Sequence, residues 1–336
     1  MKLASIELIK SITKHTTADR LELVQVMGWQ SVVKSGIHNK GDKVVFVVID
    51  TILPRESWSE FLVDKNNPDK PIRLKMIKLR GEHSAGIVLP LTEFPPEFND
   101  LDVGSDVTEH LNIKKYIKHH SFDLTGENKG DFPTHLASKT DEENGLSNLD
   151  IVEEVIKSPS VTITQKCDGS SITIVVDNGL IVDVCSRNLS KKETETSVFW
   201  KAARKLKTFE GFTGVIQGEL VGPNIQQNQM HLEDHEVVVF QIKKASGEYM
   251  NYQEMKGVCN VELTCNVVPL VSECSFIGCS TEEAITKLQD LADQQIYNNT
   301  DNPAEGIVVR PTDYKKSTSS RRPFGFKILN RNYKEN

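Results

Sequence analysis

The sequence predicts an α+β protein with two domains, and three observations lead to this fold class. The chain has 336 residues, which is long enough for two domains. Its first third holds short apolar runs between Gly, Pro and Asn, a pattern typical of a small closed β-barrel. Later strand-like runs alternate with helical periodicity, which predicts antiparallel sheets flanked by helices. We place the barrel at 1–115, a linker at 116–130 and the second domain at 131–336.

Composition indicates a soluble intracellular protein, cytoplasmic or nuclear, and we expect a monomer. Hydrophobic residues make up 38% and charged residues 26% of the chain, as in globular proteins. No apolar run approaches the roughly 20 residues that span a bilayer, and the N-terminus has no signal-peptide core. None of the six cysteines forms a C-x-x-C pair, so we expect reduced cysteines and no structural zinc site.

The net charge of −7 argues against a protein that is coated with nucleic acid. A nucleic-acid surface could still be built from clustered basic residues. Such residues gather in two stretches of the second domain: Lys201, Arg204, Lys205 and Lys207, and then Lys315, Lys316, Arg321, Arg322, Lys327 and Arg331.

The barrel is predicted from apolar or alternating runs at 21–26, 31–34, 43–49, 72–80 and 86–90. In the run 72–80 we expect Arg73, Lys75 and Lys78 on exposed faces, with Arg80 at its end. These four residues are candidates for contacts with RNA phosphates. The alternative is an ordinary solvated strand face.

Residues 116–130 are polar and lack apolar periodicity, so we expect a linker that includes Lys118, His119 and His120 rather than a metal site. In the second domain an Asn178-Gly179 turn predicts a hairpin, and Ser280 with Glu283 predicts a helix start. The expected elements are helices at 149–156, 193–207 and 280–291 and strands at 161–166, 171–176, 180–185, 213–220, 237–242, 306–310 and 326–329.

The second domain is organised around Lys166-Cys167-Asp168-Gly169. In an extended chain Lys166 and Asp168 point to the same side, and the glycine allows a tight turn after them. Such a lysine can be a nucleophile, although a lone Lys-x-Asp-Gly is more often a surface turn. Attack requires a neutral amine, which costs about 4–5 kcal/mol at pH 7 unless the site lowers the pKa of the lysine. A divalent cation held by carboxylates can lower it.

Four further segments follow in a fixed order, each in or beside a predicted strand: 186–188, 218–222, 304–310 and 326–328. With Lys-x-Asp-Gly they form a set that resembles the covalent nucleotidyltransferase superfamily of ATP-dependent ligases and capping enzymes. The resemblance implies an ATP-grasp-like ligase domain in which Lys166 carries AMP. It implies ATP as substrate, Mg²⁺ or Mn²⁺ as metal, and these nucleotide-binding residues: Gln165, Asp168, Arg187, Glu219, Phe240, Glu305 and Lys327.

Within this set the resemblance assigns Asp168, Glu219 and Glu305 to the metal, partly through water. For Glu219 and Glu305 the alternative is a salt bridge at a strand end, and for Phe240 it is a place in the core. Arg187 could equally be an exposed arginine at the end of a hairpin. The family often has a second basic residue two positions before the last-motif lysine, where this chain has Gly325. Lys327 then acts alone, or Arg321 or Arg322 substitutes.

Three features point to one branch of the superfamily. The chain ends shortly after the last motif, the extra domain is N-terminal and barrel-like, and Phe132-Pro133 with 139–142 resembles the entry to an RNA ligase domain. The chain is therefore similar to RNA ligases with an N-terminal OB-fold domain, the fifth RNA ligase family. The resemblance implies sealing of 3′-OH/5′-phosphate nicks in RNA duplexes. The alternatives are a guanylyltransferase and a non-catalytic RNA- or tRNA-binding protein.

Overall fold

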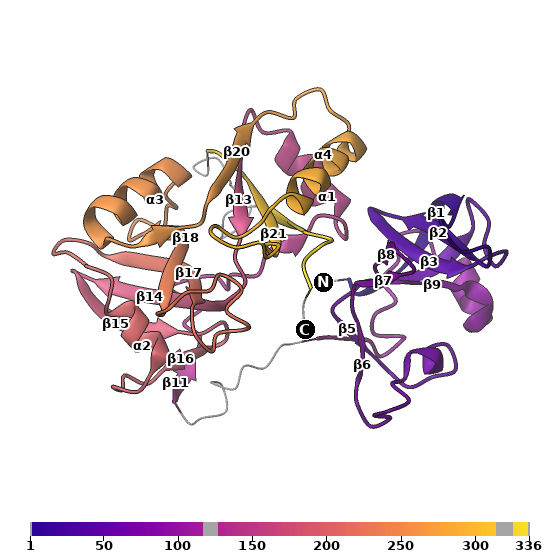
Figure 1. Cartoon of the computed structure of the whole chain (residues 1–336), viewed down its shortest axis with the longest axis horizontal. Coiled ribbons are helices and arrows are strands. Elements are labelled where there is room, and N and C mark those ends of the chain that lie inside the picture. Colours follow the sequence, from indigo (N-terminus) through magenta and orange to yellow (C-terminus); the bar gives the residue numbers. More distant parts are fainter. Residues whose placement is uncertain (1, 117–126, 314–324, 335–336) are drawn as a thin grey trace. The chain divides into compact units, whose positions relative to one another are not determined.

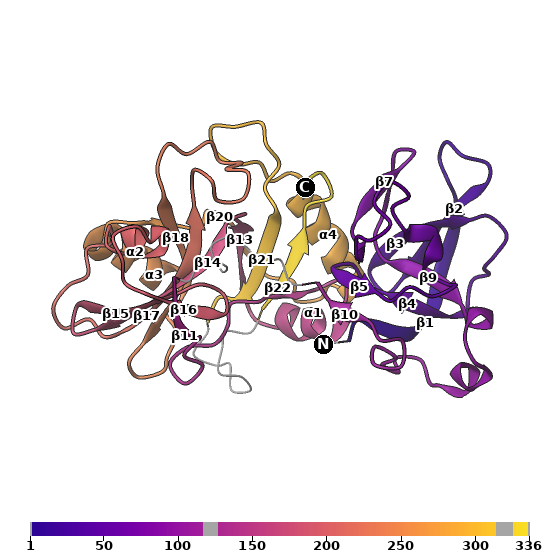
Figure 2. The same cartoon turned by 90° about the horizontal axis from the view of Figure 1, so that it is seen from below.

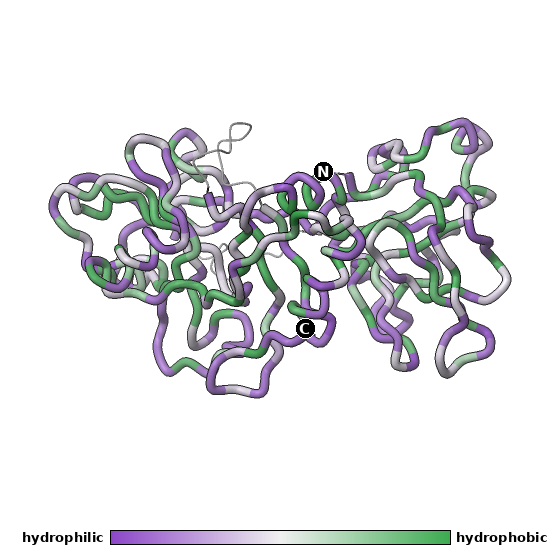
Figure 3. Tube along the Cα trace, turned by 90° about the horizontal axis from the view of Figure 1, so that it is seen from above, coloured by the Kyte–Doolittle hydropathy of each residue, from purple (hydrophilic) through white to green (hydrophobic). Residues whose placement is uncertain are grey.

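The structure is a computed structural model that describes residues 2–116, 127–313 and 325–334. It divides into two compact units, residues 1–118 and 119–336, each with its own core. Apolar stretches follow the strands, and hydrophilic stretches follow the loops (Figure 3). In the described residues no helix is long and apolar enough to cross a membrane.

The N-terminal unit is a strongly curved, all-antiparallel β structure (Figure 2). Its main sheet has the order β3-β2-β1-β4-β9, formed by β1 (Ala4–Lys14), β2 (Leu21–Val26), β3 (Trp29–Lys34), β4 (Lys43–Val47) and β9 (Ile87–Pro90). A second sheet holds β5 (Thr51–Leu53), β6 (Ile72–Leu74) and β10 (Lys114–Lys115), and β7 (Ile77–Leu79) pairs with β8 (Glu82–Ser84). Short 3₁₀ turns lie at Glu60–Leu62, Leu91–Glu93 and Pro96–Asp100.

Side-chain hydrogen bonds complete the barrel where the ladder stops. β3 and β9 are the two edges of the main sheet. The Ser31 hydroxyl on β3 donates to the carbonyl of Ala85, at 2.8 Å, just before β9. Gly86 follows with a φ of +80°, and a Cβ there would lie 2.7 Å from the Val47 carbonyl oxygen. A glycine therefore lets the chain at the start of β9 pass close to the backbone of its neighbour β4.

One strand of this unit was not predicted, and one predicted strand is wrong. The longest strand, β1, was not predicted because a bulge between Ile9 and Ser11 interrupts its alternation. The run 72–80 is not one strand, since it breaks after Leu74 and resumes as the β7–β8 hairpin, whose three β7 residues are all exposed.

The second unit contains two sheets (Figure 1). The larger has the order β11-β16-β15-β14-β17-β18-β19, with β11 (Asn128–Asp131), β14 (Ser170–Asp177), β15 (Leu180–Cys185), β16 (Leu189–Lys191), β17 (Gly214–Val221), β18 (Glu236–Lys244) and β19 (Asn266–Val267). The smaller has the order β12-β22-β21-β13-β20, with β12 (Glu143–Asn144), β13 (Val161–Lys166), β20 (Leu270–Cys274), β21 (Gly306–Pro311) and β22 (Phe326–Leu329). Among the strand pairs in the described part of this unit, only β12–β22 and β18–β19 are parallel.

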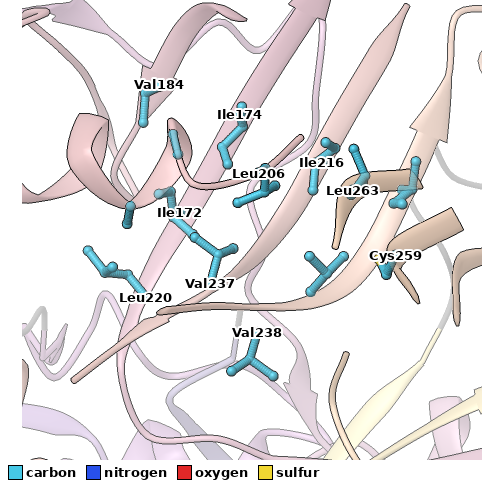
Figure 4. Packing of buried hydrophobic residues seen from close by; sticks show 14 of the residues in the cluster. Ile172, Ile174, Val184, Leu206, Ile216, Leu220, Val237, Val238, Cys259 and Leu263 are labelled. Atoms are coloured by element: carbon cyan, nitrogen blue, oxygen red, sulfur yellow. The ribbon is translucent and has the colours of Figure 1, made fainter. Parts of the chain in front are cut away.

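Helices cover each sheet. α1 (Leu149–Ile156) and α4 (Thr281–Asp293) pack on β21, while α2 (Val198–Ala203) and α3 (Tyr252–Val258) pack on β18 (Figure 1). α3 continues into a π-helical turn at Cys259–Leu263. Apolar residues from β14, β17, β18 and the π-helical turn meet in one core (Figure 4). This core holds in place the strand β17, which carries the segment 218–222.

The hairpin and the helix start predicted from the sequence are confirmed. Asn178 and Gly179 both have positive φ, 44° and 80°, between the paired residues Asp177 and Leu180. Ser280 and Glu283 form both hydrogen bonds of a capping box. The helix expected at 193–207 is shorter, because an extended approach and the cap Ser197 precede α2.

Part of the expected linker is a strand: β11 lies at the edge of the larger sheet and pairs with β16. α3 was not predicted. The calls on Lys118, His119, His120, Lys315, Lys316, Arg321 and Arg322 fall outside the described residues.

Candidate active site

Lys166 is the last residue of β13, at the point where the chain turns from the smaller sheet into the larger one. β13 lies between β20 and β21, so its backbone is bonded on both sides. The turn that follows is tight: a Cβ on Gly169 would lie 2.4 Å from the Leu220 carbonyl oxygen. The glycine of Lys-x-Asp-Gly is therefore required for close packing of β17 against this turn.

Glu305 forms an ion pair with Lys166. The Lys166 Nζ lies 2.6 Å from Glu305 Oε2, and the two side chains are 23% and 20% exposed. Strand pairing explains the contact, because Lys166 is opposite Gly306, the residue after Glu305. Burial alone would lower the pKa of Lys166, but Glu305, Glu219 and Asp168 together raise it above its ordinary value.

Glu219 comes from the larger sheet, where it pairs with Ser171 just after the Lys166–Gly169 turn, and its charge acts on the same amine. Burial raises the pKa of Glu219 to about 8, and the charges of Glu305 and Asp168 act in the same direction, while Lys166 opposes them. A carboxyl whose pKa lies this high is typical of functional sites.

These three carboxylates fit a hydrated divalent cation. In the described residues no three His, Cys, Asp or Glu side chains form a direct metal cluster, so a purely protein-ligated metal site is not present there. The carboxylates instead face a cation, the Lys166 ammonium. Mg²⁺ prefers carboxylate oxygens and usually keeps several waters, and the assignment of Asp168, Glu219 and Glu305 to the metal, partly through water, stays a prediction.

A pocket opens beside Lys166 between the two sheets. Its polar wall contains the Lys166, Glu219 and Glu142 side chains, and its apolar wall contains Phe240, Val268 and Val308. Phe240 is half-buried and packs against the core while it also lines the pocket. Core and pocket positions were therefore not exclusive alternatives for this ring. An apolar wall that contains an aromatic ring is suited to a flat base.

Arg310 and Glu142 form a buried ion pair in the pocket wall, with side chains 7% and 12% exposed. Arg310 also donates to the Phe240 carbonyl at 3.1 Å, and its guanidinium lies 5.8 Å from the Phe240 ring centre. The sequence motifs included both segments, but nothing in them indicated this pair.

Arg187 is not a free hairpin-end arginine. Its guanidinium binds both carboxylate oxygens of Asp141. Its positive charge also opposes, in small part, the rise in the pKa of Glu219 that burial causes. Next to it, Lys139 Nζ donates to Asn188 Oδ1 at 2.9 Å. The entry segment 139–142 is thereby tied to the Ser186–Asn188 turn.

Lys327 and Gln165 have different surroundings. Lys327 is opposite Val308, which is opposite Thr164, so these three residues share one face of the smaller sheet with Lys166. Gln165 is buried, and its Nε2 donates to the Ile296 carbonyl at 3.0 Å. Its carboxamide therefore holds the segment after α4, although Gln165 also lines the pocket.

Two site residues were missed. Gln226 Nε2 donates to the Gly169 carbonyl at 2.9 Å, and the buried Tyr297 hydroxyl contacts the same turn. Gln226 belongs to a loop in which Asn224, Gln226 and Asn228 all have positive φ. The density of Asn and Gln in that loop was the one available signal.

The RNA candidates lie in the N-terminal unit. The expected exposure is wrong for Arg73: its side chain is 12% exposed, forms an ion pair with Asp50 at 2.8 Å and stacks 3.6 Å from the Tyr116 ring centre. Lys78 and Arg80 are exposed on the β7–β8 hairpin, and Lys75 is half-buried before it.

Comparisons with known proteins find matches for both parts of the chain. A family model described as RNA ligase matches residues 159–327, and a model described as the PHA02142 OB-fold domain matches residues 3–91. Among curated proteins none matches.

Solved structures of Naegleria gruberi RNA ligase are similar over almost the whole chain. A lysine-to-alanine variant with ATP and Mn has a TM-score of 0.82, and a glutamate-to-alanine variant with AMP and Mn has the same value. The structure with PPi has a TM-score of 0.80. Each is 31% identical, and the match covers 98% of this chain and 97% of that one. These relatives support the expected ATP and Mg²⁺ or Mn²⁺. The chain belongs to the RNA ligase family.

Proposed function

We propose that this RNA ligase takes AMP from ATP onto Lys166 and uses it to seal 3′-OH/5′-phosphate nicks in RNA duplexes. The observation that carries the proposal is the Lys166 amine, held 2.6 Å from Glu305 at the edge of a pocket with an aromatic wall. The family membership supports it, as do the related structures with ATP and Mn, with AMP and Mn, and with PPi.

In the first step the Lys166 amine attacks the α-phosphorus of ATP. An N–P bond forms, the bond to the pyrophosphate oxygen breaks, and the amine loses its proton. Glu305 Oε2 lies where it can accept that proton. A bound divalent cation would neutralise the carboxylates, lower the pKa of Lys166 and shield the α-phosphate. Lys327, on the same sheet face, would hold the phosphate as charge develops on it.

In the second step the 5′-phosphate of the RNA attacks the lysyl-bound AMP, which gives a 5′–5′ adenylylated end and frees Lys166. In the third step the RNA 3′-OH attacks that end, the phosphodiester forms and AMP leaves. Lys78 and Arg80 of the exposed β7–β8 hairpin would contact the duplex backbone. A 2′-OH next to the reacting 3′-OH would distinguish RNA from DNA.

The first experiment tests the covalent step. The protein is incubated with α-labelled ATP and Mn²⁺ or Mg²⁺, and the denatured protein is assayed for label that survives alkali and is released by acid, as the N–P bond of lysyl-AMP requires. We expect label on the parent and on Lys157→Ala, because Lys157 is an exposed helix-end residue that is paired only with Glu153. We expect none on Lys166→Ala. Equal labelling of Lys166→Ala would refute the role of this lysine.

The second experiment tests the substrate. Matched RNA and DNA nicks are offered with ATP, and the strand that carries the 3′-OH end is varied. Sealing only when that end is RNA supports the proposal. Label transfer from GTP in place of ATP would instead indicate a guanylyltransferase, and RNA binding without any adduct would indicate a binding protein.

A further inference from the structure

One buried hydroxyl touches the backbone of two carboxylate residues that face Lys166. The Tyr297 oxygen accepts hydrogen bonds from the backbone N–H of Asp168, at 2.9 Å, and of Glu305, at 3.3 Å. Tyr297 is 1% exposed and is among the largest fully buried side chains. One oxygen therefore joins the turn after β13 to the residue before β21.

Tyr297 is itself fixed in place. Its N–H donates to the Asn302 carbonyl at 3.0 Å, and its own carbonyl accepts from the Thr300 hydroxyl at 2.9 Å. Ile296 and Pro303 form a β-bridge that closes this loop. The loop is bonded to its surroundings through Asn302 Nδ2, which donates to the Gln229 carbonyl at 2.8 Å. A rigid loop is needed if Tyr297 is to act as a fixed point.

A tyrosine hydroxyl ionises only near pH 10, so the Tyr297 hydroxyl is neutral at pH 7. A neutral hydroxyl accepts the two N–H bonds without adding charge to the site. On the side-chain end, Asp168 is hydrogen-bonded to Tyr333. Asp168 is thus held at both its backbone and its carboxylate.

We propose that Tyr297 is a positioning residue that sets where Asp168 and Glu305 stand around the Lys166 amine, and thereby how tightly the site binds a divalent cation. The inference rests on the proposed function, because the cation is part of that chemistry. Tyr297 does not touch the reacting atoms. Partners that orient metal ligands commonly change metal affinity 10–100-fold when they are removed.

The test replaces Tyr297 by Phe, which keeps the ring that fills the core and removes only the accepting oxygen. Tyr252→Phe is the matched control: Tyr252 is 4% exposed, and its hydroxyl donates to the Val268 carbonyl at 3.0 Å, on the apolar wall of the pocket. Both variants lose one buried hydroxyl in the same unit. Only Tyr297→Phe frees the two N–H groups of the carboxylate residues.

Two measurements are made without nucleotide. Hydrogen exchange of peptides that contain residues 167–169 and 304–306, without metal, should be faster in Tyr297→Phe than in the parent. The Kd for Mn²⁺, read from the electron paramagnetic resonance signal of free Mn²⁺, should rise about 10–100-fold. Tyr252→Phe should match the parent in both.

The inference is overturned if Tyr297→Phe binds Mn²⁺ like the parent, if both variants shift by the same factor, or if the parent binds no Mn²⁺. It is also overturned if exchange at 167–169 and 304–306 is unchanged. Failure of the proposed function would give a different result. The parent would bind Mn²⁺ and Tyr297→Phe would show both effects, yet no AMP would appear on Lys166.

Discussion

Replacement of Glu219 by Gln should make the protein more stable near pH 8 while it removes activity. Glu219 lies at the pocket wall, where burial raises its pKa from 4.5 to about 8. The folded state therefore holds a proton on Glu219 that the unfolded chain releases above about pH 4.5. Between these two pH values the folded protein binds more protons, so the free energy of unfolding falls as the pH rises.

The size of this effect follows from the shift in pKa. Each unit of difference corresponds to about 1.4 kcal/mol between the two protonation states. Glu219 is only partly buried and lines the pocket, so solvent screens part of the penalty. We expect the parent to lose about 2–3 kcal/mol of stability between pH 5 and pH 8 through Glu219. A neutral glutamine has no such titration.

Urea denaturation of parent and Glu219→Gln at pH 5 and pH 8, without metal and nucleotide, measures the difference. The glutamine variant should show a smaller loss than the parent by about 2–3 kcal/mol. It should also form no AMP adduct, because it lacks one of the three carboxylates proposed to hold the divalent cation. The gain in stability at the cost of activity is the usual trade at functional sites. An equal loss in both proteins, or a variant less stable than the parent at pH 8, would refute the reasoning.

Two further predictions concern a buried ion pair and an exposed hairpin. Glu142→Ala leaves the 7%-exposed Arg310 without its carboxylate, so the free energy of unfolding should fall by about 3–5 kcal/mol. Thermal denaturation measures this fall, and Glu142→Gln should show a much smaller one. An Ala variant as stable as the parent would contradict the prediction. Lys78→Ala with Arg80→Ala should weaken binding to nicked RNA duplex and reduce its salt dependence by about two phosphate contacts, with AMP-adduct formation unchanged. Binding by fluorescence anisotropy would argue against the hairpin if the exposed-turn variant Lys40→Ala lost as much.

The parts of the fold that follow local rules could be predicted from the sequence. The Asn178-Gly179 hairpin and the Ser280–Glu283 cap depend on a few neighbouring residues, and both are present. The family could also be predicted, because Lys-x-Asp-Gly and the later segments keep a fixed order along the chain, while the role of Lys166 stays a prediction. The family match over residues 159–327 agrees with that order.

Contacts between distant segments could not be predicted in the same way. Arg310 and Glu142 are separated by much of the domain, and their pairing depends on how β21 meets the segment before α1. Arg73 was expected at the surface because it alternates with apolar neighbours in 72–80, whereas the pairing of β6 with β5 brings Asp50 to its side chain and Tyr116 stacks on it. Tyr297 lies in a loop with no motif, and only tertiary structure brings its hydroxyl to Asp168.

Gly325 shows how packing accounts for a departure from the family pattern. A Cβ on Gly325 would lie 2.7 Å from the Val309 carbonyl oxygen and 2.6 Å from Arg310 Cγ, and a backbone oxygen held in a sheet cannot move aside. A basic side chain at residue 325 is therefore incompatible with this arrangement of Arg310. The Arg310 guanidinium instead reaches the pocket wall from the neighbouring strand, where Glu142 and the Phe240 carbonyl hold it. The glycine at residue 325 therefore makes room for the buried arginine, through which β21 contributes a cation to the pocket wall. Lys327 lies on the sheet face that it shares with Lys166.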